Sequence, residues 1–281
     1  MAIRLGQNQY GKAETRVVRV YRDTARHEIR DLSVSTALRG RFEAAHIRGD
    51  QSDVLPTDSQ KNTVFAFAKK HGVGAIEEFA LALARHFVES GPAVEGARVD
   101  IEEYPWQRIP AEGRPHDHAF VRVGGGVRTA SVDVDDTGPS VVSGVKDLVV
   151  LKSTGSAFRG FRHDEYTTLA ETDDRILATS LVARWRHRDT DVDWDASFCD
   201  VKAEMLARFA ELHSLALQQS LYDMGRAVLE AQPGLVEISF SAPNKHHFLV
   251  DLAPFGLDNP GEVFHAADRP YGLIEASVVR D

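Results

Sequence analysis

Polar and apolar residues alternate with period two over several stretches of the chain. In the clearest stretch, Leu32, Val34 and Leu38 share one face, and Asp31 and Ser33 lie on the other. This alternation is typical of a half-buried strand in an antiparallel sheet. The same pattern predicts strands at residues 17–21, 29–39, 99–102, 119–123, 128–134, 141–152, 177–187, 236–240 and 247–252.

Apolar residues at helical spacing separate these groups of strands. The spacing predicts one pair of helices at residues 62–71 and 75–90, which Gly91 and Pro92 end. It predicts a second pair, one helix with a stripe from Val201 to Leu212 and the next with a stripe from Leu217 to Val228.

The order of elements is therefore ββααββ, occurring twice. A boundary at Gly138 divides the chain into two predicted units, residues 1–138 and 139–281. Because the strands form hairpins, we expect an α+β fold with antiparallel sheets and helices on one face. Gly124, Gly125 and Gly126 predict a hairpin turn, since no helix follows them as in a phosphate loop. Closing the sheets into an oligomeric barrel would protect their edges.

Composition narrows the class of protein. The 281 residues are 43% hydrophobic and 27% charged, with a formal net charge of −9. The acidic balance argues against a nucleic-acid partner. One cysteine excludes a disulfide framework. No apolar run approaches the roughly 18 to 20 residues that span a bilayer. We expect a cytoplasmic globular protein with no membrane partner.

Several polar clusters admit both a structural and a functional interpretation. Asp58 or Ser59 is positioned to cap the following helix, although a helix start also binds anions. Arg175 is suited to a surface ion pair, and Phe158 to a hydrophobic core or an exposed aromatic platform. Of His246 and its neighbour His247, only one can face a given site from a strand.

The sequence gives weaker evidence for a metal site or a reactive thiol. His116 and His118 would point to one side of a strand, but no third ligand follows at a metal-binding spacing, so a solvated loop is expected. Cys199 is expected to be a small packing residue.

Together, these clusters extend over the chain in an order that resembles the urate oxidase (uricase) family. The resemblance rests on Tyr10-Gly11-Lys12 and on residues 55–63, 151–161, 164–169, 174–177 and 243–246. It implies the tunnelling fold, with two ββααββ units per chain. It also implies a homotetramer in which four chains form a barrel and the active sites lie between subunits.

The resemblance further implies oxidation of urate by O2 to 5-hydroxyisourate and hydrogen peroxide. No metal or flavin cofactor is implied, because the urate dianion is itself the electron donor. In the substrate site, Phe158 would stack on the purine and Arg175 would offer a bidentate guanidinium. Gln218 would pair with the opposite edge, and the backbone of Leu217 would also contact the ring.

The implied proton chemistry involves other residues. Lys12 and Thr57 would form the proton-handling pair, and His246 would extend that relay. The N–H groups of Thr57 and Asp58 would contact the substrate. Asn244, with the Thr57 hydroxyl, would hold dioxygen and then the attacking water above the ring.

Two other functions remain open from the sequence. A pterin-acting enzyme of the same fold would use a metal, against which the single cysteine and scattered histidines argue. A purine-binding tetramer without activity is the second, and the presence of Lys12, Thr57 and His246 argues against it.

Overall fold

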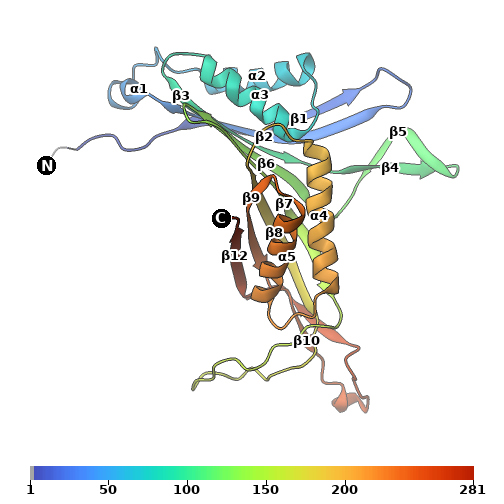
Figure 1. Cartoon of the computed structure of the whole chain (residues 1–281). Coiled ribbons are helices and arrows are strands. Elements are labelled where there is room, and N and C mark those ends of the chain that lie inside the picture. The colour runs from blue at the N-terminus through green and yellow to red at the C-terminus, as the bar shows by residue number, and fades with distance from the viewer. Residues whose placement is uncertain (1–2) are drawn as a thin grey trace. The chain divides into compact units, whose positions relative to one another are not determined.

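The computed structural model describes residues 3–281 (Figure 1). It contains two compact units. The first comprises residues up to 144 together with Arg186–Ala196, and the second comprises Val145–Trp185 and Ser197–Asp281. The expected division into tandem units at residue 138 stays a prediction.

The first unit is built on antiparallel strands in the order β1-β2-β3-β6. The bounds are β1 (Tyr10–Tyr21), β2 (Glu28–Gly40), β3 (Val94–Glu103) and β6 (Val127–Asp135). In β2, the apolar face predicted from the alternation is buried, with Leu32, Val34 and Leu38 all 0% exposed. The following strand, β7 (Gly138–Lys152), begins in this unit and continues into the second.

Helices cover one face of these strands (Figure 1). They are α2 (Thr57–Lys70), which packs against β1, and α3 (Ile76–Glu89), which packs against β3 and β6. The short α1 (Glu43–Arg48) follows β2 and has no buried residue. The apolar stripe of α3, which includes Ile76, Leu83 and Phe87, is completely buried. Burial of each such side chain stabilises the fold by about 1.5–3 kcal/mol.

A buried polar network joins α3 to the strands of this unit. Arg128 on β6 donates to the Glu77 carboxylate over 2.7 Å, and Ser143 donates to the other oxygen over 2.7 Å. The Ser143 hydroxyl also contacts His187 Nε2 at 2.9 Å. Burial and the nearby Arg128 charge lower the pKa of His187 to about 4, so the imidazole is neutral near pH 7.

A hairpin lies between β3 and β6 in the sequence, and its position contradicts one prediction. β4 (Trp106–Ala111) pairs with β5 (Arg114–Arg122), and the two project from the other strands of the unit (Figure 1). The expected hairpin around Gly125 is therefore wrong, because β6 pairs with β3 and not with β5. Trp106 anchors the projection by donating to the buried Asp31 over 3.0 Å.

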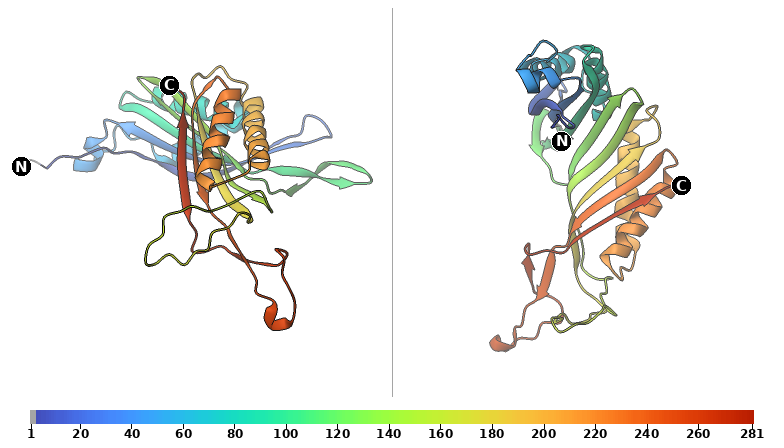
Figure 2. Two further views of the ribbon diagram at one scale, coloured as in Figure 1. Left: turned by 60° about the horizontal axis from the view of Figure 1, so that its bottom comes forward. Right: turned by 90° about the vertical axis from the view of Figure 1, so that its left-hand side faces the viewer.

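The second unit repeats the arrangement with strands in the order β7-β8-β9-β12. Its elements are most of β8 (Leu177–His187) and of α4 (Trp194–Glu211), together with α5 (Leu217–Ala231), β9 (Leu235–Pro243) and β12 (Leu273–Val279). The last two residues of β8 and the first three of α4 belong to the first unit. Helix α5 packs on β9 and β12, and Figure 2 shows it beside α4. The core includes Trp185, Met205 and Leu221, each at most 1% exposed.

The C-terminal part differs from the prediction of one last strand at residues 247–252. A short strand β10 (His246–Leu249) pairs with β11 (Phe264–Ala267), and a single 3₁₀ turn at Ala253–Phe255 lies between them. β12 then pairs with β9 as the last main strand. Its side chains are only partly covered, so its sequence lacks the strong apolar alternation of a core strand. Among the described residues, no helix has the length and apolarity needed to cross a membrane.

Candidate functional site

The predicted site residues fall into two groups, one in each unit. Lys12, Thr57 and Asp58 belong to the first unit. The other predicted residues belong to the second unit: Phe158, Arg175, Leu217, Gln218, Asn244 and His246. Both groups gather side chains that lie far apart in the sequence.

In the first unit, a chain of hydrogen bonds connects the strand of Lys12 to the helix that Thr57 begins. The Lys12 N–H donates to Thr36 Oγ1 over 3.3 Å, and that hydroxyl donates to Gln60 Oε1 over 2.7 Å. Gln60 is completely buried in the first turn of α2. Because its amide has no access to water, the bond to Thr36 is costly to break. The link therefore fixes the backbone of Lys12 relative to the first turn of α2, which Thr57 begins.

The backbone at Lys12 is irregular. The pairing of β1 with β2 shifts between Lys12 and Thr15, and Glu14 adopts a φ of 54°. Bulges of this kind re-aim a side chain and occur often beside active sites. Gly11 is needed here, since a Cβ at this position would lie 1.7 Å from the Thr36 carbonyl oxygen.

The start of α2 corrects the prediction of a side-chain cap. The helix begins at Thr57 after Pro56, and no side chain caps it. The Asp58 carboxylate accepts bonds from Lys61 and from Asn62, the latter over 3.0 Å. The hydrogen bond and charge of Lys61 lower the pKa of Asp58, with a smaller contribution from Lys12. Since the first N–H groups of a helix have no partner inside it, those of Thr57 and Asp58 can receive an anion.

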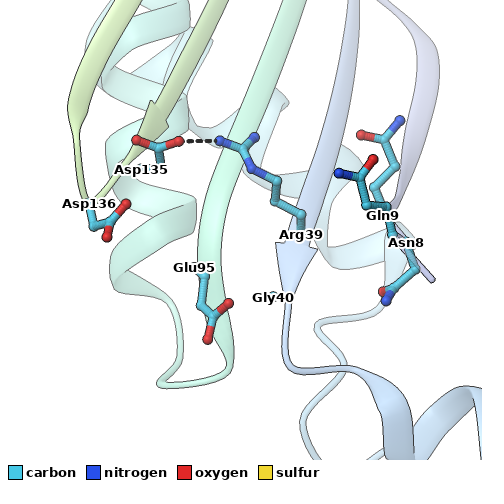
Figure 3. Close-up of a pocket in the computed structure, with 8 residues that line it drawn as sticks. Asn8, Gln9, Arg39, Gly40, Glu95, Asp135 and Asp136 are labelled. Atoms are coloured by element: carbon cyan, nitrogen blue, oxygen red, sulfur yellow. Dashed lines mark hydrogen bonds and ion pairs between the residues drawn. The ribbon is translucent and has the colours of Figure 1, made fainter. Parts of the chain in front are cut away.

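Two pockets of the first unit differ in chemistry. One, of about 530 Å³, is lined by Thr57 and by apolar side chains that include Tyr10 and Phe42. The other, of about 690 Å³, is polar, and in it Arg39 is already paired with Asp135 (Figure 3). The excess of carboxylates in the second pocket would repel an anion. Of the two, only the pocket beside Thr57 includes a predicted site residue.

In the second unit, Phe158 and Arg175 lie together. The Cζ atom of Arg175 is 4.7 Å from the centroid of the Phe158 ring. Phe161 stacks on Phe158 with ring centroids 4.9 Å apart and planes at 18°. Phe158 is half-buried and so joins neither the core cluster nor a fully exposed surface. A flat aromatic surface thus lies beside a planar cation.

Within residues 3–281, the charge of Arg175 is not neutralised. Burial lowers the pKa of its guanidinium, and its Nε is buried without a hydrogen-bond partner. No carboxylate of residues 3–281 forms an ion pair with it, so the interpretation as a surface ion pair is wrong. A partly buried cation without a counter-ion is unfavourable. An anionic ligand would remove that cost.

The first turn of α5 presents Leu217 and Gln218. Leu217 is 3% exposed and packs in the core, so contact of its backbone with a ligand stays a prediction, whereas Gln218 is exposed. The neighbouring Gln219 accepts a bond from the Leu215 N–H over 2.9 Å. No described residue hydrogen-bonds to the Gln218 amide, which can therefore offer a donor and an acceptor to a ligand.

Asn244 and His246 follow the end of β9. The Asn244 N–H donates to Gly272 over 2.8 Å, and Asn244 forms an isolated bridge with Thr179 on β8. His246 begins β10, and its ring stacks on Phe248. Strand pairing thus places the Asn244 backbone beside β8, whose first residue follows Arg175 by two positions.

The other candidates form no site. His116 and His118 lie on β5 with their rings 4.5 Å apart, so the prediction of a loop is wrong. Within residues 3–281, no group of His, Cys, Asp or Glu is arranged to hold a metal ion. Cys199 is an exposed free thiol on α4, which corrects its prediction as a packing residue.

Sequence analysis missed the residues that support the predicted ones. Thr36 and Gln60 support the first group, and Asp174 and Ser214 support the second. Gln60 lies within residues 55–63, which resemble the urate oxidase family. Its complete burial, which indicates its supporting role, can be recognised only once the fold is known. Asp174 directly precedes Arg175, which is the single sequence signal for its role.

Comparisons with known proteins agree along the whole chain. The family model described as Uricase matches residues 8–133 and 141–275. The uricase of Arthrobacter globiformis is 57% identical, covering 99% of this chain and 90% of that protein. The uricase of Danio rerio is 37% identical, covering 96% and 93%. A crystal structure of the Arthrobacter globiformis uricase has a TM-score of 0.96 at 56% identity, covering 100% of this chain and 96% of that one.

Proposed function

Because this chain belongs to the uricase family and is a urate oxidase, we propose that its two groups of site residues divide the oxidation of urate between them. The reaction converts urate and O2 to 5-hydroxyisourate and hydrogen peroxide. Phe158, Arg175, Leu217 and Gln218 of the second unit bind the purine, while Lys12 and Thr57 of the first unit, with His246 of the second, manage its protons. The main support for this assignment is the guanidinium of Arg175, which has no counter-ion in the described chain and lies over the Phe158 ring.

The substrate clamp uses three kinds of contact. Urate is a planar anion with N–H and C=O groups around its rim. Phe158 offers a face for stacking, and Arg175 offers parallel N–H donors that fix both orientation and charge. Gln218 forms hydrogen bonds with the opposite edge of the purine, and the Leu217 backbone also contacts the ring. The unpartnered amide of Gln218 supports this role.

Proton removal falls to Lys12 and Thr57, with His246 extending the relay. Urate must lose a proton before it can donate electrons, and a positioned base contributes about 10²–10⁴-fold. The bulge after Lys12 and its link to Gln60 support a placed amine. The N–H groups of Thr57 and Asp58 stabilise the negative charge of the bound purine.

Dioxygen, and then water, is held above the ring by Asn244 and the Thr57 hydroxyl. The electrons pass from the urate dianion to dioxygen, which leaves as hydrogen peroxide after taking up protons. Water then adds to the oxidised ring to give 5-hydroxyisourate. No flavin or metal is needed for this sequence, since the substrate supplies both electrons.

The active unit is a homotetramer with its sites at subunit interfaces, in which the first unit of one chain completes the second unit of a neighbour. The unsatisfied groups in each unit support such a partnership. We place the tetramer in the cytoplasm, and we infer that the two segments matched by the family model reflect tandem units divided near residue 138.

The test of this assignment measures activity and assembly on one preparation. Aerobic urate should lose its ultraviolet absorbance with stoichiometric peroxide, and light scattering should give a tetramer. Dilution into conditions that yield monomers should abolish turnover. A fully active monomer, or a preparation whose activity is lost on removal of a tightly bound flavin or copper, would overturn the assignment.

A further inference from the structure

Three residues of the proposed clamp, Phe158, Arg175 and Gln218, are positioned by one segment, Gly155-Ser156-Ala157. On one side, the Ser214 N–H donates to Gly155 over 2.9 Å, and the Ala157 N–H donates to Ser214 over 2.7 Å. On the other side, the Arg175 N–H donates to Ser156 over 2.8 Å. The segment therefore lies between the chain leading to α5 and the chain leading to Arg175.

This segment also sets the position of Phe158 and of Gln218. Phe158 and Thr172 exchange backbone hydrogen bonds of 2.8 and 3.0 Å. Ser214 and Ser220, each 1% exposed, share a hydroxyl bond of 2.7 Å across the first turn of α5, which carries Gln218. A shift of the segment would therefore move the aromatic face, the guanidinium and the amide together.

Asp174, which precedes Arg175, holds this segment in place through hydrogen bonds. Its carboxylate accepts a hydrogen bond from the Thr154 hydroxyl over 2.6 Å and from the Gly155 N–H over 2.8 Å. The Ser156 N–H adds a longer contact of 3.4 Å. The Asp174 carbonyl oxygen accepts from the Thr172 hydroxyl over 2.7 Å.

These donors, the Thr154 hydroxyl first, keep the pKa of Asp174 below its ordinary value. The carboxylate is therefore charged at neutral pH, and bonds to a charged acceptor are the stronger kind. It forms no ion pair with the guanidinium of Arg175 within residues 3–281. Asp174 thus acts on the backbone turn and leaves the cation available to the substrate.

We propose that Asp174 is a positioning residue of the urate clamp. Its carboxylate fixes the turn at residues 154–156 against the irregular segment that carries Arg175, and so holds the guanidinium at its place over the Phe158 ring. The inference rests on the proposed function, because it takes Phe158 and Arg175 as the groups that bind urate.

The test compares adjacent aspartates. Asp174→Ala removes every side-chain acceptor at the turn, whereas Asp173→Ala removes a carboxylate that is 79% exposed and pairs with the exposed Arg159. In Asp174→Ala, we expect KM and the anaerobic Kd for urate to rise about tenfold or more. Turnover at saturating urate should change much less, since the lost interaction serves binding. Asp173→Ala should bind urate as the parent does.

Conservative variants separate positioning from general stability. Asp174→Asn keeps one oxygen for the backbone N–H groups and should restore most of the affinity. Thr154→Val removes the hydroxyl donor and should weaken urate binding, whereas Thr154→Ser should not; this pair also serves if Asp174→Ala fails to fold. A merely structural role would lower the active fraction and leave KM unchanged.

Arg175→Ala, measured in parallel, distinguishes failure of the proposed clamp from failure of the positioning role of Asp174. If Arg175→Ala binds urate normally, the clamp itself is wrong. If Arg175→Ala weakens binding but folded Asp174→Ala and Thr154→Val keep the parental Kd, only the positioning role of Asp174 is overturned.

Discussion

The two groups of site residues are held in place by different means. In the first unit, Lys12 lies near the start of β1, and its backbone is tied to α2 by the buried bond between Thr36 and Gln60. In the second unit, Phe158 and Arg175 lie on irregular chain and are held by backbone bonds and an exposed carboxylate. The difference suits their proposed tasks, because proton transfer demands a short fixed geometry and stacking tolerates adjustment.

The comparison predicts that changes at Lys12 and Thr57 lower turnover, whereas changes at Phe158 and Arg175 weaken urate binding. The largest effect is expected at the proton-handling pair. Lys12→Ala or Thr57→Ala should reduce kcat by about 10²–10⁴-fold, the usual contribution of a positioned base. Steady-state kinetics with urate gives the value, and Lys69→Ala, an exposed lysine at the other end of α2, is the control. Normal turnover in both site variants would remove the pair from the mechanism.

Gly11→Ala tests the geometry of the first group without touching its functional atoms. The added Cβ would meet the Thr36 carbonyl oxygen at 1.7 Å, so β1 must move away from β2 beside Lys12. A displacement near 1 Å costs about 10²-fold in rate. Gly6→Ala is the matched control, because its Cβ would meet nothing within 4 Å. Equal kcat in the two variants would show that the placement of Lys12 is not critical.

Arg175→Ala tests the second group. The lost charged hydrogen bonds should raise KM by about 10- to 100-fold, with a smaller change in kcat. Arg162→Ala, an exposed arginine of the same loop, serves as the control in the same kinetic assay. If KM stays at the parental value and kcat falls instead, the division between the two groups is wrong.

A further expected effect concerns the stability of the first unit and not the kinetics. His187 has a folded pKa of about 4, below the ordinary value near 6.5, so the native state favours the neutral ring. The unfolded chain therefore binds more protons between these values, and stability is complete above about pH 6.5 and falls as pH decreases toward 4. The loss is on the order of 3 kcal/mol at most.

Urea unfolding at several pH values between these limits measures that loss. His187→Gln should be less sensitive to pH over this range than the parent, even though its stability at pH 7 is lower. His71→Gln, an exposed histidine at the end of α2, should keep the parental slope. A parental slope in His187→Gln would show that another group is responsible.

Sequence patterns predicted the main elements because each unit has one buried face. Leu32, Val34 and Leu38 alternate on β2, and Ile76, Leu83 and Phe87 recur at helical spacing on α3, as burial on one side requires. The hairpin at residues 124–126 was wrong for the same reason that β12 was missed. Strand pairing depends on neighbours distant in sequence, and in β12 apolar residues occur on both faces, so they do not alternate cleanly with polar ones.

The candidate residues themselves were found through the resemblance, since Lys12, Thr57 and Arg175 are ordinary polar residues in composition. Their supports were not found. Nothing in a single sequence shows that Gln60 is completely buried, or that Asp174 faces the Thr154 turn.

By itself, the sequence determined the periodicity, and with it the elements, the antiparallel class and the buried faces. It also determined which chemical groups the chain contains. Only the tertiary structure decided which of those groups meet, because a hydrogen bond such as that between Thr36 and Gln60 joins residues 24 apart. Local patterns record burial, whereas the lack of a counter-ion at Arg175 among the described residues depends on all the neighbours that the folded chain brings to it.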